Sequence, residues 1–443
     1  MTSSHTSPVS CQWFFQLAAS VDARSAVRLT RLFLGAVLAR GRRTVTSWIR
    51  AAGLSAEFRP AYATVAAAGK RADTIAARLA NTVVRPLVGG SERLLLGLDD
   101  TPTPRYGPLV QGAGVHHNPT PGPAGSAFVY GHVWVVLGLL VEHAAWGVIA
   151  LPLLARLYVR AKDLKSIDLK HRPPFRTKLE LAVELVQWAV TWLGPWGKAL
   201  WLVVDGAYAK ATFLKPLRQL GVTVISRLRK DAALCTLPGP KRPGQRGRRR
   251  LYGEQRIDLA KRAGQRRGWQ RATLVLYGER MAKRYKTFLA TWRPAGGVIR
   301  VVLVDEAHGW RAYFSTDPSA SVADILEAVA DRFSLETAFR DVKEVVGAGQ
   351  QQVRFVWANV GSFHLCLWTF TLTEGWAWNR GAAELADRGA SPWDDPTRRP
   401  SHADKRRAWR RELLAQEIHA VLQSGHSEAE LVATANRLLD MAA

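Results

Sequence analysis

The chain has 443 residues, which is more than one typical hydrophobic core supports, so two to four domains are expected. Apolar residues make up 47% of the sequence, enough to bury a core, and this excludes an intrinsically disordered protein. The 62 basic and 36 acidic residues give a net charge of +26, distributed along the whole length. This charge favours an extended polyanion as partner, most commonly nucleic acid, with a membrane surface as the weaker alternative.

The cysteines and the N-terminal sequence favour a cytoplasmic protein. Cys11, Cys235 and Cys366 are far apart and odd in number, so they predict neither a disulfide framework nor a zinc site. The first 15 residues lack a basic region followed by a long apolar run, so we expect no signal peptide.

Residues 1–90 are predicted to be helical and basic. Apolar residues recur at helical intervals up to Gly41, and a second helix is predicted between Thr44, as N-cap, and Gly53. A short helix, a turn and a second helix of this kind can enter a DNA groove, and the alternative is an ordinary amphipathic helix pair. The candidate DNA contacts here are Arg42, Arg43 and Arg50.

Two adjacent acids follow the next apolar run. Residues 94–98 predict a buried strand that ends at Asp99 and Asp100. Buried acids are costly unless they are paired or bind a metal, although a polar turn with an Asx cap is the alternative. Further on, residues 128–154 are the most apolar part of the chain. Because Glu142 and His143 interrupt this part, it predicts strands 128–141 and 146–151 rather than a membrane helix.

A second acid follows another strand. Residues 175–193 predict an amphipathic helix, residues 200–204 a strand, and residues 210–220 a helix, with a further strand after it. Asp205 stands at the carboxyl end of the 200–204 strand, where open α/β sheets place their functional sites.

Residues 231–318 differ in character and are predicted to form a β-rich insertion. The insertion begins with a Pro/Gly/Arg loop, residues 241–250, which carries six cations and is suited to phosphates. The loop's candidate DNA contacts are Arg246, Arg248, Arg249 and Arg250. Trp269 and Trp292 stand beside Arg residues and can stack on an unpaired base. For each of them taken alone, however, a position in the core is the favoured prediction.

A third acid lies on a late helix. Ser321 and Asp324 predict a capping box, and the helix is expected to continue through residues 331–343. Residues three, four and seven apart share a helix face, so Glu336 lies in a stripe with three cations. Those cations are Arg332, Arg340 and Lys343. The opposite residues, expected to pack on a core, are Phe333, Leu335, Ala338, Phe339 and Val342. A salt-bridged surface helix is the alternative.

The three acids together indicate a metal-dependent nuclease site. If Asp99 or Asp100 meets Asp205 and Glu336, the carboxylates can hold two divalent ions that act on a phosphodiester. Hard oxygen ligands suit Mg²⁺ or Mn²⁺.

These segments resemble the DDE transposases of bacterial insertion sequences, over roughly residues 90–380. The late-helix signature of that family is Tyr, two residues, Arg, three residues, Glu, six residues, Lys. Arg332, Glu336 and Lys343 stand at those intervals, whereas Val329 replaces the Tyr. LGLDDTP resembles the first-Asp motif, with Asp99 preferred over Asp100, and VVDGAYAK resembles the second-Asp motif around Asp205.

The resemblance implies an α/β fold: an RNase H-like mixed sheet flanked by helices, interrupted by a β-rich insertion and preceded by helices. The expected parts are 1–90 (DNA-binding helices), 91–230 (catalytic domain, first part), 231–318 (insertion), 319–380 (catalytic domain, second part) and 381–443 (basic helical tail).

The resemblance also implies a cut-and-paste transposase. It would bind double-stranded DNA at the element ends and at the target as a homodimer, in the bacterial cytoplasm and associated with the nucleoid when bound. The alternatives are an inactive, transposase-derived DNA-binding protein and an RNase H-like nuclease without strand transfer.

Overall fold

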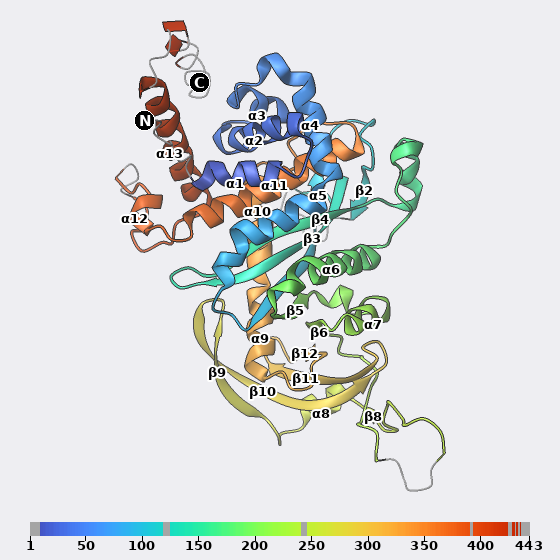
Figure 1. Ribbon diagram of the computed structural model, residues 1–443. Helices are drawn as coiled ribbons and strands as arrows, with labels where there is room; N and C mark the ends of the chain where they lie inside the picture. The colour runs from blue at the N-terminus through green and yellow to red at the C-terminus, as the bar shows by residue number, and fades with distance from the viewer. Residues whose placement is uncertain are drawn as a thin grey trace.

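A computed structural model describes residues 9–117, 125–240, 246–389 and 393–423, together with 428–429, 431–432 and 435. Over these residues the chain forms a mixed α/β structure, with a long twisted sheet in the middle and most helices gathered at one end (Figure 1). Of the three cysteines, Cys235 and Cys366 are free thiols, and the side chain of Cys11 lies outside the described part.

The sheet is mixed, as predicted for an RNase H-like fold. Strands β4 (Gly147–Tyr158), β3 (Phe128–His143) and β1 (Arg93–Pro104) pair antiparallel in that order. On its other side, β1 pairs parallel with β5 (Ala199–Val204), and β5 pairs parallel with β6 (Thr223–Leu228). The short β2 (Gly114–His117) pairs with the start of β3. The predicted mixed sheet is therefore confirmed.

Two predicted element boundaries were wrong. The first strand does not end at Asp99 but runs on to Pro104, because the 16-residue β3 continues to pair with it beyond the acids. The late helix is two helices, α9 (Val322–Asp331) and α10 (Phe333–Glu344), joined at Arg332. The Ser321–Asp324 capping box that begins α9 is present.

The insertion extends the same sheet. Strand β12 (Arg311–Ser315) pairs antiparallel with β6, and β11 (Gly297–Asp305) and β10 (Glu279–Trp292) follow beside it. Strands β9 (Gln270–Leu276) and β7 (Leu234–Cys235) pair with β10, and β8 (Arg256–Ile257) pairs with β7, beside the short helix α8 (Leu259–Gly264). Trp292 is buried against Phe314, and the half-buried Trp269 lies beneath Arg284 and Lys286.

Helix α11 (Val356–Ala377) is the centre of the helical end. Trp368 Nε1 donates to the carbonyl of Leu153 (2.8 Å), and Thr371 Oγ1 donates to that of Pro152 (2.6 Å). His364 Nε2 accepts the Ala155 N–H at 3.0 Å. These side chains cover backbone groups that edge strand β4 would otherwise leave unpaired. No helix within the described ranges is long and apolar enough to cross a bilayer.

The N-terminal helices are α1 (Val9–Ala18), α2 (Ala23–Leu38), α3 (Val45–Ala51), α4 (Phe58–Lys70) and α5 (Ala72–Leu79). They pack on α11 mainly through α2, α4 and α5. Thr44 caps α3 as predicted, and Gly53 follows it with a positive φ of 67°. Helices α4 and α11 touch through Gly69 and Gly361, where a methyl group on either would collide with the other helix's backbone.

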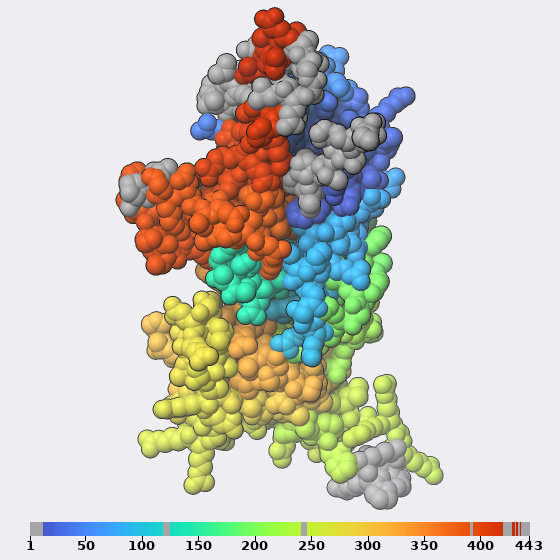
Figure 2. All heavy atoms as spheres, turned by 60° about the vertical axis from the view of Figure 1, so that its left-hand side comes forward, coloured from blue at the N-terminus to red at the C-terminus, as the bar shows by residue number. Residues whose placement is uncertain are grey.

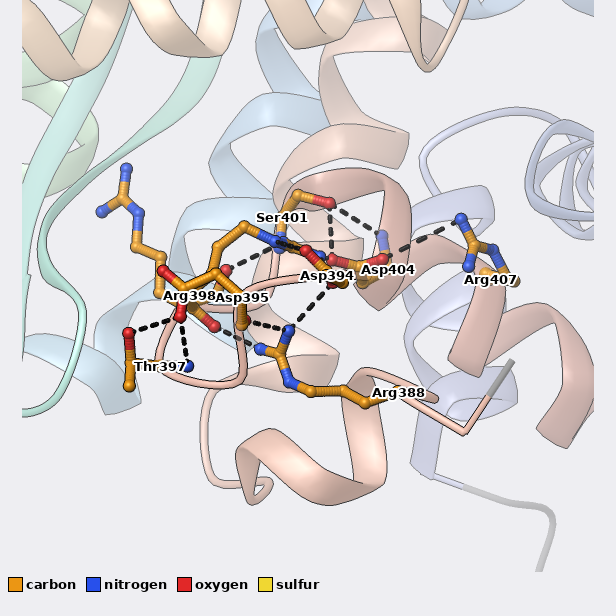
Figure 3. A network of polar contacts seen from close by, with 9 residues as sticks. Arg388, Asp394, Asp395, Thr397, Arg398, Ser401, Asp404 and Arg407 are labelled. Carbon is orange, nitrogen blue, oxygen red and sulfur yellow. Dashed lines mark hydrogen bonds and ion pairs between the residues drawn. The ribbon is translucent and has the colours of Figure 1, made fainter. Parts of the chain in front are cut away.

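The C-terminal helix α13 (His402–Gln423) is held by buried charges. Glu374 of α11 accepts from Lys405 Nζ (2.5 Å) and His402 Nδ1 (2.7 Å), and all three side chains are buried. The segment before α13 is fixed by ion pairs (Figure 3). Arg388 and Arg398 both contact Asp394, and Arg398 also contacts Asp404. The remaining helices are α6 (Lys178–Leu193), α7 (Ala211–Gln219) and α12 (Ala382–Leu385).

We predict that Glu374→Gln lowers the free energy of unfolding by about 3–5 kcal/mol, because it leaves the Lys405 charge buried without its partner. Burial opposes ionisation of Glu374, but Lys405 and His402 lower its pKa from 4.5 to about 2. Since the folded-state pKa is depressed, this stabilisation is complete above about pH 4.5 and is lost as the pH falls toward 2.

Urea unfolding at several pH values measures both effects. The control is Glu384→Gln on α12, an exposed carboxylate paired with Arg380, which should change stability by less than about 1 kcal/mol. Equal losses for the two variants would contradict the assignment.

Candidate active site

Asp99 and Asp205 stand next to each other on two parallel strands. The pairing of β1 with β5 ends at Leu98 and Val204, and the two acids are the next residues along each strand. The Asp205 carboxylate accepts the Ala207 N–H at 3.2 Å and begins the short turn at residues 206–208. Sheet pairing therefore places the first two candidate acids beside each other, with Asp205 at the carboxyl end of its strand, as the sequence predicted.

Asp99 lies on the face of the sheet that α10 covers. Gly97, two residues earlier on the same face, lies directly beneath Leu335. The packing is so close that a methyl group at Gly97 would come within 2.6 Å of Leu335 Cδ1. Arg332 reaches from the α9–α10 junction and donates through Nη1 to Asp99 Oδ2 at 2.5 Å. Its Nη2 donates to Glu336 Oε1 at 3.1 Å, so one guanidinium bridges the two carboxylates.

Asp100 takes part in a different set of contacts. Its Oδ2 accepts from Lys178 Nζ of α6 at 2.5 Å, and its Oδ1 accepts from Tyr208 Oη at 3.4 Å. Because successive side chains of a strand point to opposite faces, Asp100 points away from α10. The structure thus groups Asp99, and not Asp100, with Glu336.

The environment of Asp99 disfavours its charge. Burial raises the pKa of Asp99 to about 6, against the opposing effect of the Arg332 guanidinium. The neighbouring carboxylates of Asp100 and Asp205 also raise it. A carboxylate in this position gains from any further positive charge placed beside it.

The rest of the α10 stripe is less regular than predicted. Glu336 is half exposed and contacts only Arg332 of the three expected cations. Arg340 is exposed and pairs with Asp341 at 3.4 Å, and Lys343 is half-buried, with burial lowering its pKa. Leu335, Ala338, Phe339 and Val342 are buried as expected. Phe333 is wrongly predicted, since it is 53% exposed and touches Tyr277 of the β9–β10 turn edge-on.

A cationic cavity adjoins Asp205. It has a volume of about 410 Å³ and lies at the carboxyl ends of β5 and β6 and the start of β12. Its lining cations are Arg227, Arg229, Lys230 and Arg311. These residues are not among the site residues predicted from the sequence. Arg227 lies near the end of β6, and Arg229 and Lys230 follow that strand. Strand β6 pairs with β5, the strand that leads to Asp205. Arg311 is brought there only by the pairing of β12 with β6.

The other predicted DNA contacts lie on elements that carry none of the three acids. Arg42 is exposed in the loop between α2 and α3, Arg50 is exposed on α3, and Arg43 is half-buried in the same loop as Arg42. Arg246, Arg248, Arg249 and Arg250 are exposed in the loop between β7 and β8, at the opposite end of the molecule (Figure 1). Residues 241–245 lie outside the described part. Arg250 pairs with Glu254, so the loop is not wholly without an acidic partner.

The donor set suits a hard divalent cation in its chemistry, since Asp99, Asp205 and Glu336 offer only carboxylate oxygens. Among the described residues, however, no three acids, histidines or cysteines lie close enough together to hold a metal ion. Arg332 supplies the positive charge between Asp99 and Glu336. A metal ion held by both carboxylates would therefore require the guanidinium to leave at least one of them.

The comparison with protein families agrees with this arrangement. The model of the DDE superfamily endonucleases matches residues 16–295, well over half of the chain. The chain therefore belongs to this family, whose members typically act on DNA as nucleases or transposases with divalent metal ions. The matched range contains Asp99 and Asp205 and ends before α10. No curated protein matches the chain.

We predict that Arg332→Gln makes the protein more responsive to divalent metal ions. Without metal, the variant should lose roughly 1–3 kcal/mol of stability, because the part-buried Asp99 loses a charged hydrogen bond. With Mn²⁺ or Mg²⁺, its melting temperature should rise more than that of the wild type, since the carboxylates no longer have a competing cation.

Thermal unfolding with and without metal measures this response. The control is Arg340→Gln, which removes an exposed cation from the same helix that contacts neither Asp99 nor Glu336. A metal-induced rise equal to that of the wild type would contradict competition by Arg332.

Proposed function

We propose that this DDE superfamily endonuclease is the cut-and-paste transposase of a bacterial insertion sequence. It would bind the terminal inverted repeats of the element, cut the DNA strands there and join them to target DNA. The observation that carries the proposal is that three acids from distant segments lie in one region of the sheet: Asp99 and Asp205 directly follow one parallel pairing, and Arg332 joins Asp99 to Glu336.

The proposed catalytic residues and metal ligands are Asp99, Asp205 and Glu336, with two Mg²⁺ or Mn²⁺ ions. Asp99 is preferred to Asp100 because it faces α10, whereas Asp100 is paired with Lys178. When bound, the ions would activate water or a 3′-hydroxyl and stabilise the departing oxygen.

The residues around the acids have separate roles in this proposal. The cations of the cavity beside Asp205 hold the phosphates of the strand to be cut, which keeps the strand in place next to the acids. Arg332 neutralises Asp99 and Glu336 in the protein without DNA and then turns to a phosphate as the strand enters. Arg340 and Lys343 are proposed as further DNA contacts along α10.

DNA binding is proposed for two further regions: the N-terminal helices through Arg42, Arg43 and Arg50, and the Arg-rich loop of the insertion. The proposal includes a homodimer on paired element ends and a cytoplasmic, nucleoid-associated location. The proposal also includes the five parts of the chain predicted from the sequence, with boundaries at about residues 90, 230, 318 and 380.

We predict that Asp99→Asn, Asp205→Asn and Glu336→Gln each reduce strand cleavage by at least about 100-fold, because each removes a proposed metal ligand. DNA binding should be retained, since the basic surface is unchanged. The matched control is Asp100→Asn, which changes the neighbouring acid of the same strand and should retain most cleavage.

Cleavage and strand joining are measured on DNA that carries the element ends, with Mg²⁺. Wild-type cleavage without joined products would favour a nuclease that lacks strand transfer, and no cleavage at all would favour an inactive DNA-binding descendant. Loss of activity in Asp100→Asn but not in Asp99→Asn would reverse the choice between the two acids.

A further prediction concerns the loop between β7 and β8. Replacing Arg246, Arg248, Arg249 and Arg250 with Ala should leave the melting temperature nearly unchanged, because these side chains are exposed. Affinity for element ends should fall, and the salt dependence should weaken by roughly 0.9 in slope for each lost phosphate contact.

The control carries Lys at the same four positions, which keeps the charge but not the guanidinium geometry. If the Ala variant unfolds, or binds the ends as tightly as the wild type, the loop is not a DNA contact.

A further inference from the structure

Four arginines from the two ends of the chain meet near the end of α2. Arg40 and Arg43 lie in the loop of residues 39–44 between α2 and α3, and Arg406 and Arg410 lie on α13. Helix α13 packs against α2, and Figure 2 shows the red C-terminal helix beside the blue N-terminal helices. We refer to these four residues as the arginine cluster.

Arg406 is the buried member of the arginine cluster, with only 6% of its surface exposed. Its Nη2 donates to the carbonyls of Ala36 (3.0 Å) and Ala39 (2.7 Å), and so it caps the C-terminal end of α2. Its Nε has no hydrogen-bond partner among the described residues. The cap therefore accounts for one end of the guanidinium and leaves its charge without a carboxylate.

Arg43 reaches into the same loop. Its Nη1 donates to the carbonyl of Gly41 at 2.7 Å, and its Nε also lacks a partner within the described ranges. Neither Arg43 nor Arg406 forms an ion pair with any described acid. Within the described ranges, the two guanidiniums thus contact one short loop and donate only to neutral carbonyl groups.

The electrostatic effects agree with this geometry. Burial, followed by the charges of Arg43 and Arg410, lowers the pKa of Arg406 to about 9. Burial, followed by Arg40 and Arg43, lowers the pKa of Arg410. The members of the arginine cluster therefore lie close enough for their charges to repel one another.

Other cations of α13 are compensated by acids. Arg407 lies 3.9 Å from Asp404, Arg411 pairs with Asp387 at 3.2 Å, and Lys405 pairs with the buried Glu374. Acids of α13 and of neighbouring segments thus pair with these cations, whereas no described acid pairs with Arg406. An ordinary structural helix would be expected to pair a buried guanidinium in the same way.

We infer that the arginine cluster is a binding site for backbone phosphates of DNA, built jointly by the 39–44 loop and α13. Arg40, Arg43 and Arg410 form its accessible rim, and Arg406 provides the charge beneath them. Several guanidiniums around one anion match the charge and donor geometry of phosphate. The choice of DNA as the source of the phosphate rests on the proposed function.

The arginine cluster is also linked to the loop that follows α10. The Arg43 N–H donates to Gln350 Oε1 at 2.7 Å, and Gln351 Nε2 donates to the Arg43 carbonyl at 2.9 Å. Arg105, at the end of β1, donates to the carbonyls of Gly349 and Gln351 in that loop. The 39–44 loop and the end of β1 are therefore both anchored to the loop that follows α10.

The test compares two charge-matched double variants. Arg43→Gln/Arg410→Gln removes two rim cations, and Arg407→Gln/Arg411→Gln removes two exposed cations that have acidic partners. The probe is a short DNA duplex of mixed sequence without divalent metal, titrated at several salt concentrations. We expect the rim variant to bind about tenfold more weakly, with a salt slope smaller by roughly one to two, and the control to change less than twofold.

Equal weakening in both variants, or an unchanged salt slope in the rim variant, would overturn the inference. A second measurement tests for a small phosphate ligand in place of DNA. If pyrophosphate raises the melting temperature of the wild type but not of the rim variant, while the two proteins bind DNA equally well, the ligand is a small phosphate and the inference is overturned. If the rim variant does not fold, Arg40→Gln replaces it, with an expected loss of about two- to threefold. Metal-free binding is independent of cleavage, so the arginine cluster and the proposed chemistry can fail separately.

Discussion

The parallel pairing of β1 with β5 is the constraint on which the candidate site depends. Its register ends at Leu98 and Val204, so Asp99 and Asp205 follow as neighbours, although more than 100 residues separate them in sequence. The alternation of β1 then assigns Asp99 to the face of α10 and Asp100 to the face of α6. A shift of one residue in this register would exchange the two acids.

Close packing of α10 makes the third acid available. Gly97 has no side chain, which lets Leu335 rest on β1 and places Arg332 and Glu336 within reach of Asp99. The extension of the sheet through β12 adds cations beside Asp205, so the insertion contributes to the same edge. The acids and the cations around them are therefore positioned by one continuous sheet and by helix α10, which packs on it.

The cations of this basic protein fall into two kinds: those that form ion pairs with acids inside the fold, and those that form no ion pair with a described acid. Glu374 between Lys405 and His402, and the ion pairs around Asp394 and Arg398, fix the C-terminal helix and the segment before it. The cavity cations Arg227 and Arg311 and the buried Arg406 form no ion pair with a described acid. Cations of the second kind are the ones that an external polyanion would compensate.

The sequence by itself determined the local elements, because period, caps and turn residues act over a few positions. It predicted the strands around residues 94–98, 128–141 and 200–204, the Thr44 cap and the Ser321–Asp324 capping box. It could not decide between Asp99 and Asp100, place Arg311 beside Asp205, or show that Arg332 bridges two acids. Those features depend on strand register and on the seating of α10, which arise from contacts between residues far apart in sequence. The same reason explains why β1 runs beyond its acids and why Phe333 is exposed: the pairing partner and the packing surface are supplied only by the folded chain.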